Sequence, residues 1–241
     1  MQTLKNEMLT IQVSEHGAEL QSIRKDDYEY LWQGNPEYWG RRSPVLFPIV
    51  GSVWEKCFRV DGKVYEMGQH GFARDMDFEL VSAADTEVWY RLESSEKTLA
   101  AYPWPFVLEI GYRLEGNSVK VLWKVTNPGE TEMYFQIGAH PAFNYPGYDP
   151  DAVDRGVVAF DRNDNLQRSG FKGKGCVDPQ ARFPIPLSDD GMLRLKRDTF
   201  DDIDTLMLEN DQVHKIVFLK NDSSPYLTVT FDAPVVAIWS P

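Results

Sequence analysis

The feature that most constrains the fold is an alternation of apolar and polar side chains with a period of two. In the stretch SVKVLWKVTN (118–127), every second residue from Val119 to Val125 is apolar, and lysines stand at two of the positions between them. This period places the apolar side chains on one face of a half-buried strand. The preceding stretch EIGYRL (109–114) and the turn Glu115-Gly116-Asn117 predict a hairpin with that strand.

Comparable runs recur along the chain and are separated by Gly, Pro, Asn and Asp. Besides the hairpin, we expect strands at 9–14, 18–23, 30–32, 63–67, 77–83, 87–94, 133–140, 156–161, 206–210, 215–220, 226–231 and 235–240. Many short strands joined by short turns predict an all-β protein built as an antiparallel sandwich or barrel-like stack. Helical periodicity is nearly absent, apart from a short helical turn expected near 198–203.

The least regular part of the sequence is 162–192, which we expect to form a loop. It contains GFKGKG (170–175), a glycine-rich run without the spacing of a Walker phosphate-binding loop. A solvated turn is therefore the expected structure of this run.

Composition and charge exclude several classes of function. Hydrophobic residues make up 42% of the 241 residues, which predicts a folded core rather than disorder. The formal net charge of −12 argues against a nucleic-acid partner, because binding to phosphate backbones needs a basic face. The sequence shows neither a signal peptide nor an apolar run of membrane-spanning length, so we expect a cytoplasmic protein with no membrane partner. Cys57 and Cys176 match no zinc spacing and are expected to be unpaired thiols.

Two of the four histidines stand in contexts that suit a binding site. His70 lies in GQHGFARD (68–75) with Arg74 four residues later, and His140 ends a predicted strand. A strand end can direct a side chain toward a ligand while the following loop leaves space. Imidazole, with a pKa of about 6.5, can donate or accept a proton near neutral pH. Spacing alone leaves an ordinary solvated turn open as the alternative. His16 and His214 lie at predicted turns and are expected to be surface residues.

Six stretches taken together resemble the aldose 1-epimerase (galactose mutarotase-like) family, and most closely its LacX-type branch. In chain order they are GAELQSI (17–23), EYLWQGNPEYWGRRSPVLFPIVGS (29–52), HGFARD (70–75), GAHPAFNYP (138–146), DDIDTLML (201–208) and FDAPVVAIWSP (231–241). The resemblance implies an antiparallel β-supersandwich with an open sugar-binding cleft. It also implies interconversion of the α and β anomers of a hexose or hexose phosphate, without a cofactor or a metal.

The resemblance assigns roles to the two histidines. His140 is expected to be the general acid that protonates the ring oxygen O5, and His70 is expected to hold the sugar. Gly71 is expected to allow the backbone to turn closely beneath the ligand, and Phe72 to pack inward.

It also assigns sugar contacts. Arg74 is expected to contact a hydroxyl or a phosphate, and Asp204 is expected to bind the sugar. Arg41 or Arg42 is expected to contact the substrate, and both remain candidates. Phe143 could stack on the sugar, as could Trp32, Trp39 and Trp239, although burial is the simpler expectation for large aromatic side chains.

One departure from the family pattern concerns the base. The family places a glutamate in an Ile-Glu-Pro-Trp-like context near its C-terminus, and no Glu-Pro-Trp occurs in this sequence. Glu209 does not match that motif position. We therefore expect residues 1–241 to form a single domain without the family's C-terminal strand. A shortened chain is the favoured explanation, because the missing segment would also supply a strand that the sheet is expected to pair. An inactive product and another carboxylate in place of the glutamate are the alternatives. A non-catalytic carbohydrate-binding or sensing protein is the alternative function, and the oligomeric state is left open.

Overall fold

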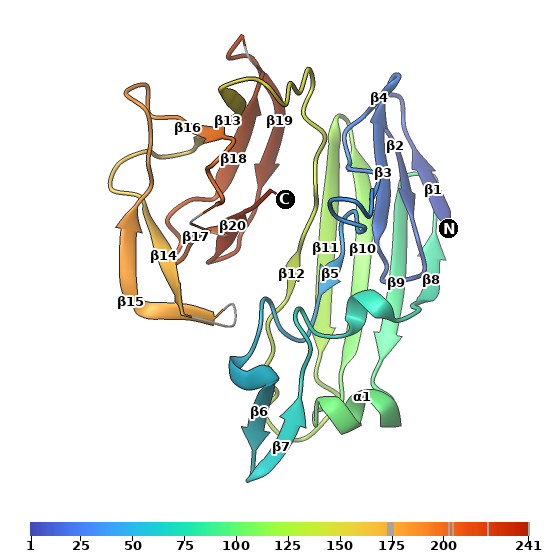
Figure 1. Ribbon diagram of the computed structural model, residues 1–241. Helices are drawn as coiled ribbons and strands as arrows, with labels where there is room; N and C mark the ends of the chain where they lie inside the picture. Colours follow the sequence, from blue (N-terminus) through green and yellow to red (C-terminus); the bar gives the residue numbers. More distant parts are fainter. Residues whose placement is uncertain (173–175, 202, 204, 221, 241) are drawn as a thin grey trace. The chain divides into compact units, whose positions relative to one another are not determined.

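The computed structural model describes residues 1–172, 176–201, 203, 205–220 and 222–240 (Figure 1). The chain is nearly all-β, as predicted, and its paired strands run antiparallel. Its contacts divide it into two compact units, Met1–Asn144 and Tyr145–Pro241. The single domain expected from the sequence stays a prediction, and each unit is described by itself.

The first unit is built on two four-stranded antiparallel sheets. The first sheet has the order β1-β2-β3-β4, with β1 (Gln2–Lys5), β2 (Thr10–Val13), β3 (Leu20–Lys25) and β4 (Tyr28–Glu29). The second has the order β11-β10-β9-β8, with β8 (Glu79–Ala83), β9 (Glu87–Glu93), β10 (Val107–Glu115) and β11 (Ser118–Thr126). The β10–β11 pair is the hairpin that the sequence predicts.

These two sheets share one hydrophobic core. In β9 the alternating residues Val88, Tyr90 and Leu92 are buried, as a period of two requires. The hydroxyl of Tyr112 in β10 donates to the carbonyl oxygen of Ala18 at 2.8 Å, next to β3. This contact joins the sheets and satisfies a hydroxyl that burial would otherwise leave unpaired.

Strand β11 is less buried than the sequence predicts. Val119 and Val125 pack against the core, but Val121 is 41% exposed and Trp123 is 37% exposed. Because β11 is the edge strand of its sheet, it is covered less than the inner strands are.

Shorter elements complete the first unit. They are β5 (Val45–Leu46), β6 (Cys57–Val60), β7 (Lys63–Glu66), β12 (Gly138–Ala139), the 3₁₀ helices η1 (Trp54–Lys56) and η2 (Ala73–Asp75), and the α-helix α1 (Glu96–Ala101). The strand predicted at 133–140 is reduced to β12, because its partner β5 is itself only two residues long. Helix α1 begins with a capping box formed by Ser95 and Thr98 and is too short to show a helical period in the sequence. Within the described residues, no helix is long and apolar enough to span a membrane.

The second unit contains a four-stranded sheet and two strand pairs. The sheet has the order β16-β13-β18-β19, with β13 (Asp154–Phe160), β16 (Leu193–Lys196), β18 (Lys215–Leu219) and β19 (Pro225–Thr230). The pairs are β14 (Gln167–Lys172) with β15 (Cys176–Pro184), and β17 (Leu206–Leu208) with β20 (Val236–Ile238). A separate hydrophobic core contains Val158, Leu193, Leu206, Leu208 and Ile216.

One prediction in this unit was wrong. The region 162–192, expected to be a loop, contains the β14–β15 pair. Alternation of apolar residues did not predict these strands, because polar and cation–π contacts stabilise the pair. Arg168, for example, lies 4.6 Å from the centre of the Phe183 ring. Gly170–Lys172 therefore belong to a strand, and 173–175 lie outside the described residues. A helical turn was expected near 198–203; the described residues there form hydrogen-bonded turns, in which Asp201 N–H donates to the carbonyl oxygen of Asp198, and residue 202 lies outside the described residues.

Candidate functional site

Residues 44–47 form a junction between the two histidine segments. On one side, β5 pairs with β12, and the N–H of His140 donates to the carbonyl oxygen of Pro44 at 3.1 Å. On the other side, the carbonyl oxygen of Phe47 accepts hydrogen bonds from the N–H groups of Phe72 and Ala73 at 3.0 and 3.2 Å. Each histidine segment is therefore fixed to the same short stretch of backbone.

This junction brings together two histidines that are far apart in the sequence. The ring centroids of His70 and His140 lie 5.6 Å apart, and the rings are nearly perpendicular at 87°. The structure thus places the two histidines that the sequence analysis selected side by side.

Gly71 makes the close approach at the junction possible. Its φ angle is +71°, and a Cβ atom built on it would lie 2.2 Å from the carbonyl oxygen of Phe47. Only glycine combines this backbone conformation with this spacing. The close turn predicted for Gly71 is present, and the group that it approaches is the backbone of Phe47. Phe72 packs inward as predicted, with its ring centroid 6.0 Å from that of Phe106.

The hydrogen bonds of His70 define its neutral tautomer. Its backbone N–H donates to the carbonyl oxygen of Gly51 at 2.7 Å, and its Nδ1 accepts from the N–H of Gly51 at 3.0 Å. Because Nδ1 is an acceptor, the proton of the neutral ring resides on Nε2. Burial, helped by the neighbouring His140, Arg74 and Arg41, lowers the pKa of His70 to about 4. At neutral pH, His70 is therefore a hydrogen-bond donor through Nε2.

His140 lies against Trp39. The two ring centroids are 4.9 Å apart and the rings are inclined by 30°. Burial lowers the pKa of His140, and the charge of Arg74 acts in the same direction against an opposing hydrogen bond to the backbone. The sequence left burial and sugar stacking open for Trp39; in the structure it is a partly exposed residue on the histidine pair.

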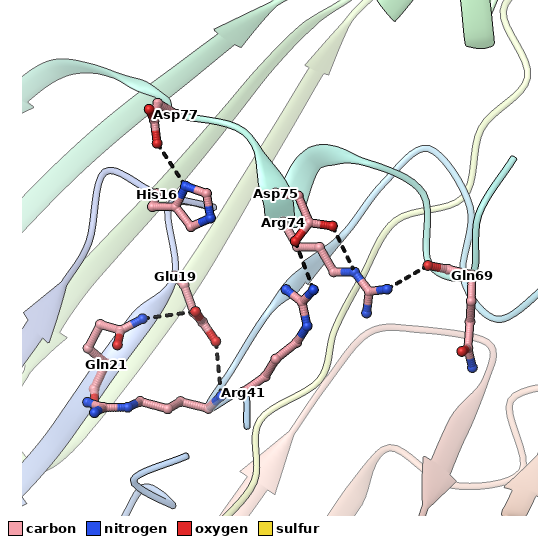
Figure 2. A network of polar contacts seen from close by, with 9 residues as sticks. His16, Glu19, Gln21, Arg41, Gln69, Arg74, Asp75 and Asp77 are labelled. Atoms are coloured by element: carbon pink, nitrogen blue, oxygen red, sulfur yellow. Dashed lines mark hydrogen bonds and ion pairs between the residues drawn. The ribbon is translucent and has the colours of Figure 1, made fainter. Parts of the chain in front are cut away.

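Arg74 and Arg41 converge on the carboxylate of Asp75, as Figure 2 shows. Nη2 of Arg41 donates to Oδ1 of Asp75 at 2.8 Å. Nη2 of Arg74 donates to the carbonyl oxygen of Gln69 at 2.8 Å, and its Nε lies 3.7 Å from Oδ2 of Asp75. Burial and the charge of Arg41 lower the pKa of Arg74, while Asp75 opposes this effect.

The side chain of Arg42 contacts the backbone of Gln21 instead of Asp75. Its Nη1 donates to the carbonyl oxygen of Gln21 at 2.9 Å, and its backbone N–H donates to Glu19 at 3.1 Å. Of the two arginines that the sequence could not separate, Arg41 is the one whose charge acts on His70.

An open hollow of about 570 Å³ adjoins these residues. It is lined by His16, Glu19, Gln21, Trp39, Gly40, Arg41, Arg42 and Asp75. Trp39 and Arg41 line the hollow and also belong to the surroundings of the histidine pair. An aromatic face beside several fixed polar groups suits a small polar ligand.

Sequence reasoning missed two residues of this region. Asp75 is the last residue of HGFARD, and Glu19 lies within GAELQSI, so both stand inside motifs that were recognised. Glu19 accepts hydrogen bonds from the N–H groups of Arg42 and Ser43 and thereby fixes the backbone that follows Arg41. Attention to charged residues beside the recognised histidine and arginine could have found Asp75.

The remaining predicted residues are placed differently. Phe143 is partly buried against the core of the first unit and forms an isolated bridge with Leu31. Asp204 lies outside the described residues. Glu209 belongs to the second unit, where it contacts Ser169 and Arg182. No group of three or more His, Cys, Asp or Glu residues gathers as metal ligands within the part of the chain that the structure describes.

These features define a class of protein: an antiparallel all-β chain with paired histidines, clustered arginines and a polar hollow. The chain belongs to the aldose 1-epimerase family, which its sequence matches over residues 1–241.

Relatives with known sequences or structures agree with this assignment. The chromosomal protein LacX of Lactococcus lactis subsp. lactis is 33% identical over 247 residues, which cover 98% of this chain and 82% of LacX. A galactose mutarotase-related enzyme from Lactobacillus acidophilus has a similar structure, with a TM-score of 0.91 and 33% identity over 99% of this chain and 80% of that one. A galactose mutarotase-like protein from Lactobacillus casei ATCC 334 gives a TM-score of 0.92 and 32% identity, over 100% of this chain and 83% of that one.

Proposed function

We propose that this protein is an aldose 1-epimerase, which interconverts the α and β anomers of a free hexose or hexose phosphate by acid/base ring opening. The observation that carries the proposal is the pair His70 and His140, whose ring centroids lie 5.6 Å apart beside Arg74 and Arg41. Family membership agrees with this function. The reaction needs proton transfers and no redox step, so we propose that it proceeds without a cofactor.

The chemistry requires two linked proton transfers. A base takes the proton from the anomeric hydroxyl, and an acid protonates the ring oxygen O5 as the C1–O5 bond breaks. Rotation about the C1–C2 bond then exposes the other face of the aldehyde, and the reversed transfers close the ring. In this scheme the His140 imidazolium is the acid. Its lowered pKa makes it a stronger proton donor, although less of it is protonated at neutral pH.

The neighbouring groups hold the sugar. His70, neutral and protonated on Nε2, donates to a sugar oxygen. Arg74 and Arg41 donate to hydroxyls or to a phosphate, and Trp39 offers an apolar face to the sugar ring. Donors fixed in place by other hydrogen bonds orient the substrate without reorganisation during the reaction.

A carbohydrate-binding protein without turnover is the second candidate. It is favoured by the engagement of the Asp75 carboxylate with Arg41, which leaves that carboxylate paired instead of free to act as a base. Among the described residues, we assign none as the base that takes the proton from the anomeric hydroxyl. Asp204, the sugar-binding aspartate implied by the family motif, remains part of the proposal.

Anomer exchange separates the two candidates. Exchange would be measured by NMR with glucose, galactose and glucose 6-phosphate, for the wild type, His140→Ala and His214→Ala. If the protein is an epimerase, the wild type exceeds the buffer rate. His140→Ala then loses about 10²–10⁴-fold of the catalysed rate, and His214→Ala, at an exposed position in the second unit, is unchanged. Sugar binding with exchange at the buffer rate would support the second candidate and contradict the first.

A further inference from the structure

The carboxylate of Asp75 lies between two arginines and is hydrogen-bonded to only one of them (Figure 2). Asp75 is the last residue of η2, so the turn that carries Arg74 also carries this carboxylate. Its Oδ1 accepts a hydrogen bond from Arg41 at 2.8 Å, whereas its Oδ2 lies 3.7 Å from Nε of Arg74. The second distance is an ion pair and is too long for a hydrogen bond.

The two arginines depend on Asp75 to different degrees. Arg74 has another anchor in the carbonyl oxygen of Gln69, and its side chain is 17% exposed. Among the described residues, Asp75 is the only hydrogen-bond partner of the Arg41 guanidinium, whose side chain is 34% exposed. Removal of the carboxylate should therefore release Arg41 and leave Arg74 in place.

The unsatisfied nitrogen of Arg74 shows which contact the carboxylate favours. Nε of Arg74 is buried and has no hydrogen-bond partner within the described residues. A buried donor without a partner is costly, and a small movement of Asp75 toward Arg74 would satisfy it. The carboxylate instead keeps its short contact with Arg41. In this arrangement the carboxylate is hydrogen-bonded to Arg41, while Nε of Arg74 has no hydrogen-bond partner within the described residues.

The position of Arg41 matters because it lies where two parts of the site meet. It lines the polar hollow, and its charge acts on His70 together with those of Arg74 and His140. Two guanidinium groups repel each other, and a carboxylate between them offsets that repulsion. An exposed arginine without such a partner would move toward water.

We propose that Asp75 is a positioning residue, which holds the guanidinium of Arg41 beside the histidine pair so that it can donate to a sugar oxygen. This inference rests on the proposed function, because it concerns substrate binding at the same site. It adds a residue that contacts no reacting atom and acts through Arg41.

The kinetic test compares Asp75→Asn, Asp75→Glu and Asp190→Asn with the wild type in the anomer-exchange assay. Asp190 is a matched control, because its carboxylate is partly exposed and pairs with an arginine, Arg194, in the second unit. For Asp75→Asn we expect KM to rise by about threefold to tenfold while kcat changes by less than about twofold, since Arg41 contributes equally to ground-state and transition-state binding. Asp75→Glu should restore part of the loss, and Asp190→Asn should match the wild type. Wild-type kinetics for Asp75→Asn would overturn the inference and leave the proposed function intact.

A second test needs no catalytic activity. The pKa of His70 would be followed by NMR in the wild type, Asp75→Asn, Arg41→Gln and the double variant. If Asp75 positions Arg41, its loss moves Arg41 away, and the pKa of His70 rises slightly above about 4, because burial, His140 and Arg74 lower it more than Arg41 does. Arg41→Gln should have the same effect, and the double variant should add nothing further.

The same measurement can also contradict the proposed role of Asp75. If Arg41 stays in place without Asp75, the loss of a nearby negative charge leaves the pKa of His70 unchanged or lower, and the inference is wrong. Failure of the wild type to exchange anomers would reject the proposed function, and the four-variant comparison would still decide whether Asp75 positions Arg41.

Discussion

Among the carboxylates that contact arginines, Asp75 of the first unit and Glu209 of the second unit have different surroundings. Glu209 of the second unit accepts hydrogen bonds from Arg182 and from Ser169, which is 1% exposed. Asp75 of the first unit is 53% exposed at its side chain, and its hydrogen bond goes to an arginine that lines an open hollow. Glu209, whose side chain is 25% exposed and which accepts two hydrogen bonds, therefore stabilises packing within its unit. Asp75, which is more open to solvent, is placed to orient Arg41, as we propose.

The largest expected effect concerns the junction that supports the first of these regions. In Gly71→Ala, the new Cβ would clash with the backbone of Phe47, which cannot move like a flexible side chain. We expect unfolding free energy to fall by about 3 kcal/mol or more, because a steric clash adds to an unfavourable positive φ. Chemical denaturation would measure the loss.

Gly62→Ala provides the matched control for that substitution. Gly62 also has a positive φ, +78°, but no atom lies within 4 Å of the place that an alanine Cβ would take. The cost should be only about 1–2 kcal/mol, from the backbone conformation alone. Equal losses in the two variants would contradict the role assigned to the contact between Gly71 and Phe47.

An intermediate effect would sharpen the comparison of the two carboxylates. Glu209→Ala leaves the buried hydroxyl of Ser169 without its acceptor and removes one of the acceptors of Arg182, which should lower unfolding free energy by about 1–3 kcal/mol. Asp75→Asn should cost less than about 1 kcal/mol, because ion pairs between exposed side chains contribute little. Denaturant titrations of both variants, paired with anomer exchange, should show a stability defect for Glu209→Ala and a kinetic defect for Asp75→Asn. A kinetic defect for Glu209→Ala and a stability defect for Asp75→Asn would contradict the distinction between the two carboxylates.

The smallest expected effect is the pH dependence that His70 gives to stability. Its pKa is about 4 in the folded protein and about 6.5 when unfolded, so the unfolded state binds more protons between these values. Stability should therefore be fully present above pH about 6.5 and decrease as the pH falls toward about 4. We expect His70→Gln to reduce the loss between pH about 7.5 and about 5 by about 1 kcal/mol, after allowance for solvent screening of a partly exposed ring.

His214→Gln, at an exposed histidine of the second unit, is the control for that measurement. Urea denaturation at the two pH values would give the change of unfolding free energy with pH for both variants. If His70→Gln keeps the slope of the wild type, the neutral ring inferred from the contact with Gly51 is wrong.

Much of the fold could be predicted because most strands alternate with a period of two. The 109–114 and 118–127 runs gave the β10–β11 hairpin directly. The β14–β15 pair could not be found in this way, because contacts such as that of Arg168 with Phe183 leave no apolar alternation. Helix α1 was missed because six residues are too few to show a period of 3.6.

Part of the candidate site could be predicted because several of its residues stand in sequence motifs. His70, His140 and Arg74 stand in recognisable motifs, and the structure places them together. Sequence could not choose between Arg41 and Arg42, because the choice depends on which guanidinium meets Asp75 across the fold. The role of Asp204 stays a prediction, since that residue lies outside the described part of the chain.

The most direct test of the central claim, that His70 and His140 together form a sugar site, is NMR of the imidazole groups during addition of glucose or galactose. The chain has only four histidines, so each signal can be assigned by single substitutions. We predict that sugar shifts the signals of His70 and His140 and leaves that of His214 unchanged. Absence of any shift at His70 and His140 at saturating sugar, or a shift confined to His214, would contradict the account.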